Sequence, residues 1–171
     1  MSAIDYRIGN DLDLSEVIEL YNASTLGERR PTAERDRMAA MLRHANLVVT
    51  AWHAQRLVGL ARTLTDFVYV GYLADLAVHA DYQRQGIGKG LLARTRAEMG
   101  PKSMLVLLVA PKAVDYYPRL GFTRHESAWV LRATEPFPVA PAKRNRCDAP
   151  PFVGGGPGRV ESSWRTGRAT G

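Results

Sequence analysis

The most constraining feature of this 171-residue sequence is a strand, a glycine-containing loop and a helix that follow one another over residues 72–92. An apolar run at residues 72–78 predicts a buried strand, and the loop QRQGIG at residues 83–88 leads directly into a helical pattern. In such an arrangement the first backbone N–H groups of the helix are free to face an anion. Gly86 and Gly88 would let the backbone approach that anion closely, since they carry no β-carbon. The segment therefore predicts a diphosphate site.

Length and composition predict one ordinary globular domain. The hydrophobic fraction is 46% and the charged fraction is 23%, and a chain of this length can bury a core without disulfides or metals. The single cysteine, Cys147, fits a reducing compartment. No run approaches the roughly 20 apolar residues of a membrane helix, and residues 1–5 do not have the layout of a signal peptide. A cytoplasmic protein without a membrane partner is expected.

Charge and metal-ligand spacing exclude two further classes of function. The net charge is +6, but no long basic run or basic-aromatic patch occurs before residue 133, so no nucleic-acid partner is predicted. Four scattered histidines and one cysteine have no metal-ligand spacing, so no metal is predicted.

Hydrophobic periodicity predicts an α/β fold with a mixed sheet, antiparallel early in the chain and parallel around the glycine loop. Residues 104–109 (MLVLLV) read as a strand covered on both faces. The remaining expected elements are a strand at 6–8, a helix after Asp13 with a capping-box spacing, a helix at 32–43, two strands at 47–52 and 56–61, the helix after the glycine loop, a short helix at 113–120 ended by Gly121, and one or two strands within 122–132.

The composition changes at Ala133. Six of the ten prolines and six of the fifteen glycines fall in residues 133–171, and no periodicity continues there. Such a segment has too little apolar surface to offset its ordering entropy. We therefore predict a folded domain over residues 1–132 and a disordered tail over residues 133–171.

Two motifs together resemble a known family. The run DLAVHADYQRQGIGKGLL contains Gln83, Gly86 and Gly88 at the spacing Gln/Arg-x-x-Gly-x-Gly/Ala, which resembles the acetyl-CoA-binding motif of the GCN5-related N-acetyltransferases, the GNAT superfamily. The run AVDYYPRLGF at residues 113–122 resembles a second block of that family. The resemblance implies the GNAT fold, a mixed central sheet flanked by helices, from the N-terminus to about Arg132.

The resemblance also implies a binding site for acetyl-CoA, the co-substrate. Backbone N–H groups of the loop would hold the diphosphate, the edge of the strand at 76–78 would pair with the pantetheine arm, and a splayed neighbour at 106–109 would leave a slot. The cofactor-binding residues implied are Leu76, Ala77, Val78, Gln83, Arg84, Gln85, Gly86, Ile87, Gly88, Lys89, Ala113 and Tyr116.

The resemblance assigns one catalytic residue. Tyr117 falls on the tyrosine that protonates the departing thiolate in the family. The position where many members carry a proton-accepting Glu is Ala74 here, and Ala110 stands where many carry Asn. Strand alternation places Ala74 and Asp75 on opposite faces, so we interpret Asp75 as a structural residue, paired with an arginine or capping an N–H group. The general base is unassigned.

The implied function is an N-acetyltransferase that moves acetyl from acetyl-CoA to a primary amine of a small molecule or peptide by direct attack. Two alternatives stay open: a non-catalytic CoA-binding or regulatory domain, and transfer to a protein lysine or N-terminus. The acceptor and the oligomeric state, including a homodimer, are also open.

Overall fold

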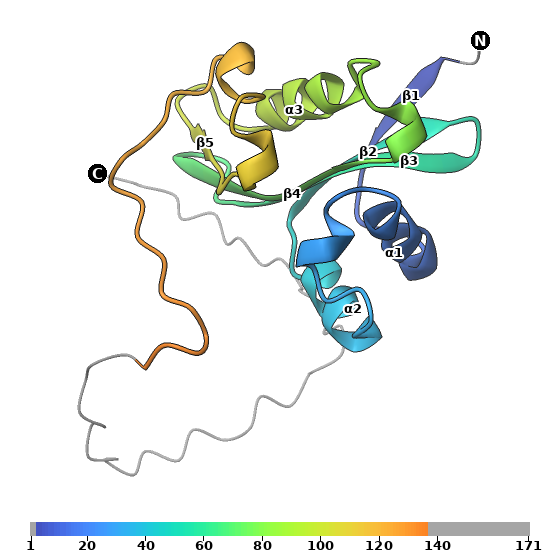
Figure 1. Cartoon of the computed structure of the whole chain (residues 1–171). Helices are drawn as coiled ribbons and strands as arrows, with labels where there is room; N and C mark the ends of the chain where they lie inside the picture. The colour runs from blue at the N-terminus through green and yellow to red at the C-terminus, as the bar shows by residue number, and fades with distance from the viewer. Residues whose placement is uncertain (1–2, 137–171) are drawn as a thin grey trace, which may run out of the picture. The chain divides into compact units, whose positions relative to one another are not determined.

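A five-stranded sheet organises the chain in the computed structural model, which describes residues 3–136 (Figure 1). The strands lie in sequence order, β1-β2-β3-β4-β5, with antiparallel pairing up to β4 and parallel pairing between β4 and β5. This confirms the predicted mixed sheet. The strands are β1 (Ile4–Ile8), β2 (Leu47–His53), β3 (Arg56–Thr65), β4 (Val70–Val78) and β5 (Met104–Val106).

Helices cover both faces of the sheet, with α3 on one face and α1 and α2 on the other (Figure 1). They are α1 (Leu14–Asn22), α2 (Arg35–Arg43) and α3 (Ile87–Glu98). The Asp13 side chain caps α1 as expected, accepting from the backbone N–H groups of Ser15 and Glu16. The second helix begins at Arg35 rather than at Thr32, because the N–H of Glu34 turns back to the Pro31 carbonyl at 2.9 Å.

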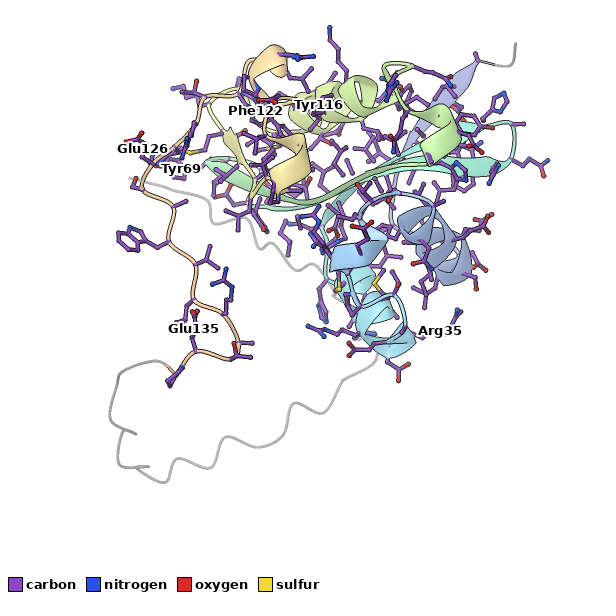
Figure 2. The ribbon with its side chains drawn as sticks, viewed as in Figure 1. Arg35, Tyr69, Tyr116, Phe122, Glu126 and Glu135 are labelled. Atoms are coloured by element: carbon purple, nitrogen blue, oxygen red, sulfur yellow. The ribbon has the colours of Figure 1, made fainter. Side chains whose placement is uncertain are left out.

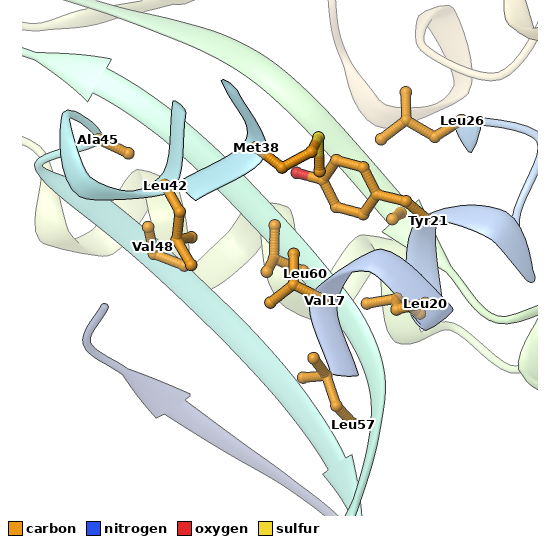
Figure 3. Close-up of a cluster of buried hydrophobic side chains, with 11 residues drawn as sticks. Val17, Leu20, Tyr21, Leu26, Met38, Leu42, Ala45, Val48, Leu57 and Leu60 are labelled. Atoms are coloured by element: carbon orange, nitrogen blue, oxygen red, sulfur yellow. The ribbon is translucent and has the colours of Figure 1, made fainter. Parts of the chain in front are cut away.

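Two apolar cores result from this layering. In the first, Val17 and Leu20 reach from α1 toward Leu57 and Leu60 of β3 (Figure 3). In the second, the expected apolar side of α3 is buried against the sheet. Its buried residues are Ile87, Leu91, Leu92, Thr95 and, at the end of the helix, Met99. Each core removes several large side chains from water, at about 1.5–3 kcal/mol per side chain, so both faces hold β3 and β4 rigidly.

The pairing of β4 with β5 ends after three residue pairs. The register runs from Val70 opposite Met104 to Tyr72 opposite Val106, and no pairing follows. The prediction of a strand over 104–109 covered on both faces is therefore wrong: β5 is short, and Leu108 is 50% exposed. The physical reason is that β5 is an edge strand with β4 as its single neighbour among the described residues.

The segment after β5 also departs from the sequence predictions. Instead of one helix over 113–120, the chain forms two 3₁₀ turns, Pro111–Ala113 and Pro118–Leu120, because each proline starts a turn and cannot continue one. Gly121 ends the second turn at φ +86°, as expected of a glycine stop. The predicted strands at 122–132 are absent from the described structure, and Trp129 there is 93% exposed.

A β-bulge interrupts β4 at Ala74. Thr63 pairs with Leu73 and Arg62 with Asp75, so Ala74 is an extra residue without a partner on β3. As a result, Leu73 packs in the α3 core while Asp75, two residues on, contacts the side of α1. Alternation therefore breaks between Leu73 and Asp75, whereas the predicted separation of Ala74 from Asp75 is not contradicted, since Ala74 lines a cleft with Leu76 and Asp75 does not.

Tertiary contacts divide the described residues after His125. The sheet, the helices and both cores belong to the first unit. The predicted tail lies almost wholly outside the described residues, and the domain boundary at residue 132 stays a prediction. Over residues 3–136, no helix has the length and apolar character needed to cross a membrane.

Candidate active site

The glycine loop ends in a helix start that has no side-chain cap. Gly86 is the N-cap residue of α3 with φ +82°, a left-handed conformation that favours glycine. The N–H of Gly90 makes the first helical bond, to the Gly86 carbonyl at 2.9 Å. The N–H groups that precede it in the first turn have no intrahelical acceptor four residues earlier. This end of α3 can therefore accept an anion.

Side chains of the loop shape this helix start. The Gln83 amide donates to the Val78 carbonyl at 3.1 Å, and the Gln85 amide donates to the Asp81 carbonyl at 3.2 Å. Arg84 and Lys89 are exposed, so both cations are available beside the loop. Ile87 instead is buried in the α3 core, where its side chain anchors the helix to the sheet.

A cleft of about 270 Å³ lies beside the end of the β4–β5 pairing. Its lining residues are Thr25, Leu26, Arg29, Arg30, Leu73, Ala74, Leu76, Gln83, Leu107, Leu108, Ala110, Ala113 and Tyr117. Four of the residues predicted from the sequence are therefore brought together: Leu76, Gln83, Ala113 and Tyr117.

The other predicted residues lie around this cleft or away from it. Val78 is half-buried on the α3 side, like Leu76, whereas Ala77 faces the core of α1 and α2. The Ala77 side chain is therefore turned away, and its backbone alone remains for a ligand. Tyr116 lies on the α3 side of the sheet (Figure 2). Its hydroxyl is 2.7 Å from the point that a β-carbon on Gly88 would occupy.

Tyr117 carries the one hydroxyl that lines the cleft from the segment after β5. Its ring packs against Tyr116 and Phe122 in edge-on geometry, with centroids 5.3 and 5.4 Å apart. Burial raises the pKa of Tyr117 and the neighbouring Tyr116 adds to the shift, although the charge of Arg29 opposes it. The raised pKa keeps the Tyr117 hydroxyl protonated at neutral pH. Within residues 3–136 no hydrogen bond engages this hydroxyl, so it is free to donate.

Asp75 is buried in an ion-pair cluster, as expected for a structural residue. Its carboxylate accepts from Arg30 and Arg62 at 2.5 Å each, and from the Tyr21 hydroxyl at 3.0 Å. Arg30 also donates to the carbonyl of Ala74, the bulge residue, at 2.7 Å. Burial raises the pKa of Tyr21, and the Asp75 charge adds to this shift. The cluster ties the loop after α1 to β4 and leaves Asp75 out of the cleft lining.

A larger cavity of about 510 Å³ lies between α3 and the turn at residues 118–121. Its charged lining residues are Lys89, Arg96 and Arg119. Arg96 is occupied with the backbone carbonyls of Gly100 and Pro101, which it binds beyond the end of α3. Although this cavity is larger, neither Tyr117 nor the free edge of β4 lines it. The smaller cleft therefore contains the groups that acetyl transfer would need and is the candidate active site.

The sequence predictions assigned no role to the arginines on one side of the cleft. Arg29 and Arg30 sit on the short 3₁₀ turn Gly27–Arg29 and just after it, and both line the cleft. Their consecutive positions in a polar loop gave no periodic signal. The role of Arg62 could not be predicted either. A charged residue within an apolar strand is explained only once the structure shows that it pairs with Asp75.

Comparison with known proteins places the chain among acetyltransferases. The family model described as "Acetyltransferase (GNAT) domain" matches residues 22–132. An uncharacterized N-acetyltransferase, ycf52, from Gracilaria tenuistipitata var. liui is 32% identical over 39% of this chain and 37% of its own length. A glucosamine 6-phosphate N-acetyltransferase from Trypanosoma brucei brucei is 27% identical over 72% of this chain and 91% of its own. The chain thus spans well under two thirds of the first of these relatives.

Solved structures share the fold. A GNAT family acetyltransferase from Streptococcus pneumoniae TIGR4 is 25% identical, with a TM-score of 0.60 over 76% of this chain and 99% of its own. An aminoglycoside N-acetyltransferase, AAC(6')-Iy, in complex with CoA is 18% identical, with a TM-score of 0.62 over 78% of this chain and 97% of its own.

Proposed function

Since the chain belongs to the GNAT acetyltransferase family, we propose that it transfers an acetyl group from acetyl-CoA to a primary amine. One observation carries the proposal: residues at the free end of the β4–β5 pairing and the unpartnered Tyr117 hydroxyl line the same cleft. Gln83, which also lines this cleft, lies in the loop that leads to the uncapped start of α3. The domain that does this is residues 1–132, supported by the family match up to residue 132. A single cysteine supports a cytoplasmic location.

The residues present fit the proposed co-substrate. A β-carbon built on Gly86 meets no atom within 4 Å, so the loop backbone there is open to an approaching phosphate. Arg84 and Lys89 add positive charge beside the helix start, which itself favours an anion. Within residues 3–136, the edge of β4 after Tyr72 has no strand partner on the β5 side, so its backbone can pair with an extended, amide-containing arm.

The chemistry needs few groups from the protein. The acetyl group is supplied as a thioester. The amine nitrogen bonds to the carbonyl carbon, the carbon–sulfur bond breaks, and the Tyr117 hydroxyl gives its proton to the departing thiolate. The described lining includes no carboxylate or imidazole, so the amine attacks as the free base. The proton that its nitrogen sheds on becoming an amide passes to water, and Tyr117 regains its proton from solvent.

The acceptor class rests on the comparisons. AAC(6')-Iy is also known in complex with a bisubstrate analog, CoA-S-monomethyl-acetylneamine, and the Trypanosoma relative is named for a phosphorylated amino sugar. Both names support a small-molecule amine. A non-catalytic CoA-binding domain is the second candidate, favoured by the lack of a proton-accepting group in the described lining.

Two measurements test the proposal. Release of free thiol from acetyl-CoA with a panel of amines should be saturable in the amine. Gly86→Val should lower the affinity for CoA at least tenfold. A β-branched residue is strained at φ +82°, and its side chain would stand where the diphosphate approaches the loop backbone. Gly9→Val is the control, since Gly9 also has positive φ but lies at the end of β1. Unchanged CoA affinity in Gly86→Val would contradict the assignment of the glycine loop as the diphosphate site. CoA binding without turnover of any amine would favour the non-catalytic candidate.

A further inference from the structure

In the described lining of the cleft, the charged side chains are both arginines. Arg29 and Arg30 are the charged residues among the described lining, and the other lining residues are neutral. We infer that the acceptor is a primary amine that also carries an anionic group, a phosphate or a carboxylate. This inference rests on the proposed function, because it names the substrate class of the same site.

Arg29 is the guanidinium available to that anion. It is exposed, and among residues 3–136 no side-chain hydrogen bond or ion pair engages it. It lies close enough to the Tyr117 hydroxyl for its charge to lower the pKa of that tyrosine against the larger effect of burial. An anionic group on Arg29 would therefore hold its molecule within reach of the residue proposed to protonate the leaving thiolate.

Arg30 has a different role, because its guanidinium is already engaged. It bonds to the Asp75 carboxylate and to the Ala74 carbonyl, and its side chain is 23% exposed. These contacts fix the loop on which Arg29 stands. Arg30 and Arg62 share the buried Asp75 carboxylate, and of these two arginines Arg30 alone lines the cleft, beside Arg29.

Electrostatics of this kind selects between classes of amine. A polycationic amine would place further positive charge beside Arg29 with no carboxylate in the described lining to compensate it, and like charges in a partly desolvated cleft repel. A phosphate or carboxylate instead forms charge-assisted, bidentate hydrogen bonds with a guanidinium. The apolar lining residues, Leu73, Leu76, Leu107 and Leu108, strengthen both effects by lowering the local dielectric.

The experiment compares matched amines that differ in the anionic group. Glucosamine 6-phosphate is paired with glucosamine, and β-alanine with its amide, so that the two arms separate phosphate from carboxylate; spermidine represents the polycations. The kcat/KM for the acceptor is measured in the wild type, in Arg29→Gln and Arg29→Lys, and in Arg37→Gln as a control. Arg37 is also an exposed arginine, and it pairs with Glu34 at the start of α2.

The expected result is a kcat/KM at least tenfold higher for the anionic member of one pair than for its neutral partner. Arg29→Gln should remove most of this preference through the KM for the acceptor, Arg29→Lys should retain part of it, and Arg37→Gln should leave it unchanged. The KM for acetyl-CoA should stay within about twofold. A preference for the neutral or polycationic amines, or a loss in Arg29→Gln that falls on acetyl-CoA instead of the acceptor, would overturn the inference.

Failure of the proposed function gives a different result. If no amine is acetylated although CoA binds, transfer to these amines is ruled out. Calorimetry then measures the binding of each amine to the CoA-loaded protein and tests the inference without turnover. Tighter binding of glucosamine 6-phosphate or β-alanine than of the neutral partner, lost in Arg29→Gln, supports an anionic ligand. Equal binding of both members overturns it.

Discussion

The Tyr116 hydroxyl occupies the space that Gly88 leaves open, 2.7 Å from where a β-carbon would stand. The next Tyr116 atom, Cζ, is 3.7 Å from that point, which is an ordinary contact distance. The second glycine of the loop thus leaves room for a neighbouring side chain, in addition to any room that an approaching phosphate needs. Tyr116 and Gly88 link the two sequence motifs physically.

We expect Gly88→Ala to displace the Tyr116 hydroxyl and to destabilise the protein by at most about 1–3 kcal/mol, the usual cost of overpacking, with the helix propensity of alanine offsetting about 1 kcal/mol of it. Tyr116→Phe in the same chain removes the atom in conflict and should restore most of the loss, because the nearest ring atom then lies at 3.7 Å. Urea denaturation of the two single variants and the double variant measures the coupling. A double variant no more stable than Gly88→Ala would contradict the contact.

Tyr117→Phe should lower kcat roughly 10²-fold or more, because the thiolate would leave without its proton donor. The ring contacts with Tyr116 and Phe122 are retained in the variant, so CoA affinity and melting temperature should change little. Steady-state thiol release gives kcat, and Tyr69→Phe is the control, since Tyr69 is 65% exposed and does not line the cleft. An unaltered kcat would remove Tyr117 from the chemistry.

The pH dependence of the rate should have no alkaline loss below the ordinary tyrosine pKa of about 10. Burial and Tyr116 raise the pKa of Tyr117, so its donating, protonated form persists above the pH at which a solvated tyrosine ionises. At lower pH, kcat/KM for the acceptor should rise with pH as the amine loses its own proton. A pH–rate profile checks both limbs, and a decline that begins below pH 9 would be inconsistent with Tyr117 as the acid.

Asp75→Ala should lower the free energy of unfolding by about 3–5 kcal/mol, because it leaves Arg30 and Arg62 partly or fully buried without their carboxylate. Glu34→Ala breaks an exposed ion pair with Arg37 and should cost at most about 1 kcal/mol. Denaturant unfolding of both variants is the measurement. Similar losses in the two would mean that the buried cluster contributes no more than a surface pair.

Sequence patterns were sufficient where a segment has one buried face and a clear end. The α3 side chains repeat at helical spacing and Asp13 marks the start of α1, so both helices could be predicted. The hairpin of β2 and β3 follows from two apolar runs around a tight turn. The same patterns failed for 104–109, since an apolar run does not reveal whether a strand has one neighbour or two.

The site was harder to predict because it depends on contacts far apart in the chain. The bulge at Ala74 is a property of the register between β3 and β4 and leaves no mark in composition. Asp75 and its arginines come from three separate segments, and Arg29 became a cleft residue only when the loop after α1 was placed beside Tyr117. Spacing within one segment, by contrast, was enough to find the glycine loop.

The early end of the β4–β5 ladder has a consequence for amide hydrogen exchange. In the described part of the chain, no strand protects the amides of residues 73–78 that point away from β3, although these residues lie between the two apolar cores. They should exchange with solvent far faster than the amides bonded to β3, and a ligand that pairs with this edge should slow them selectively. The exchange rates of these amides would therefore report whether a ligand occupies the edge of β4, without any catalytic assay.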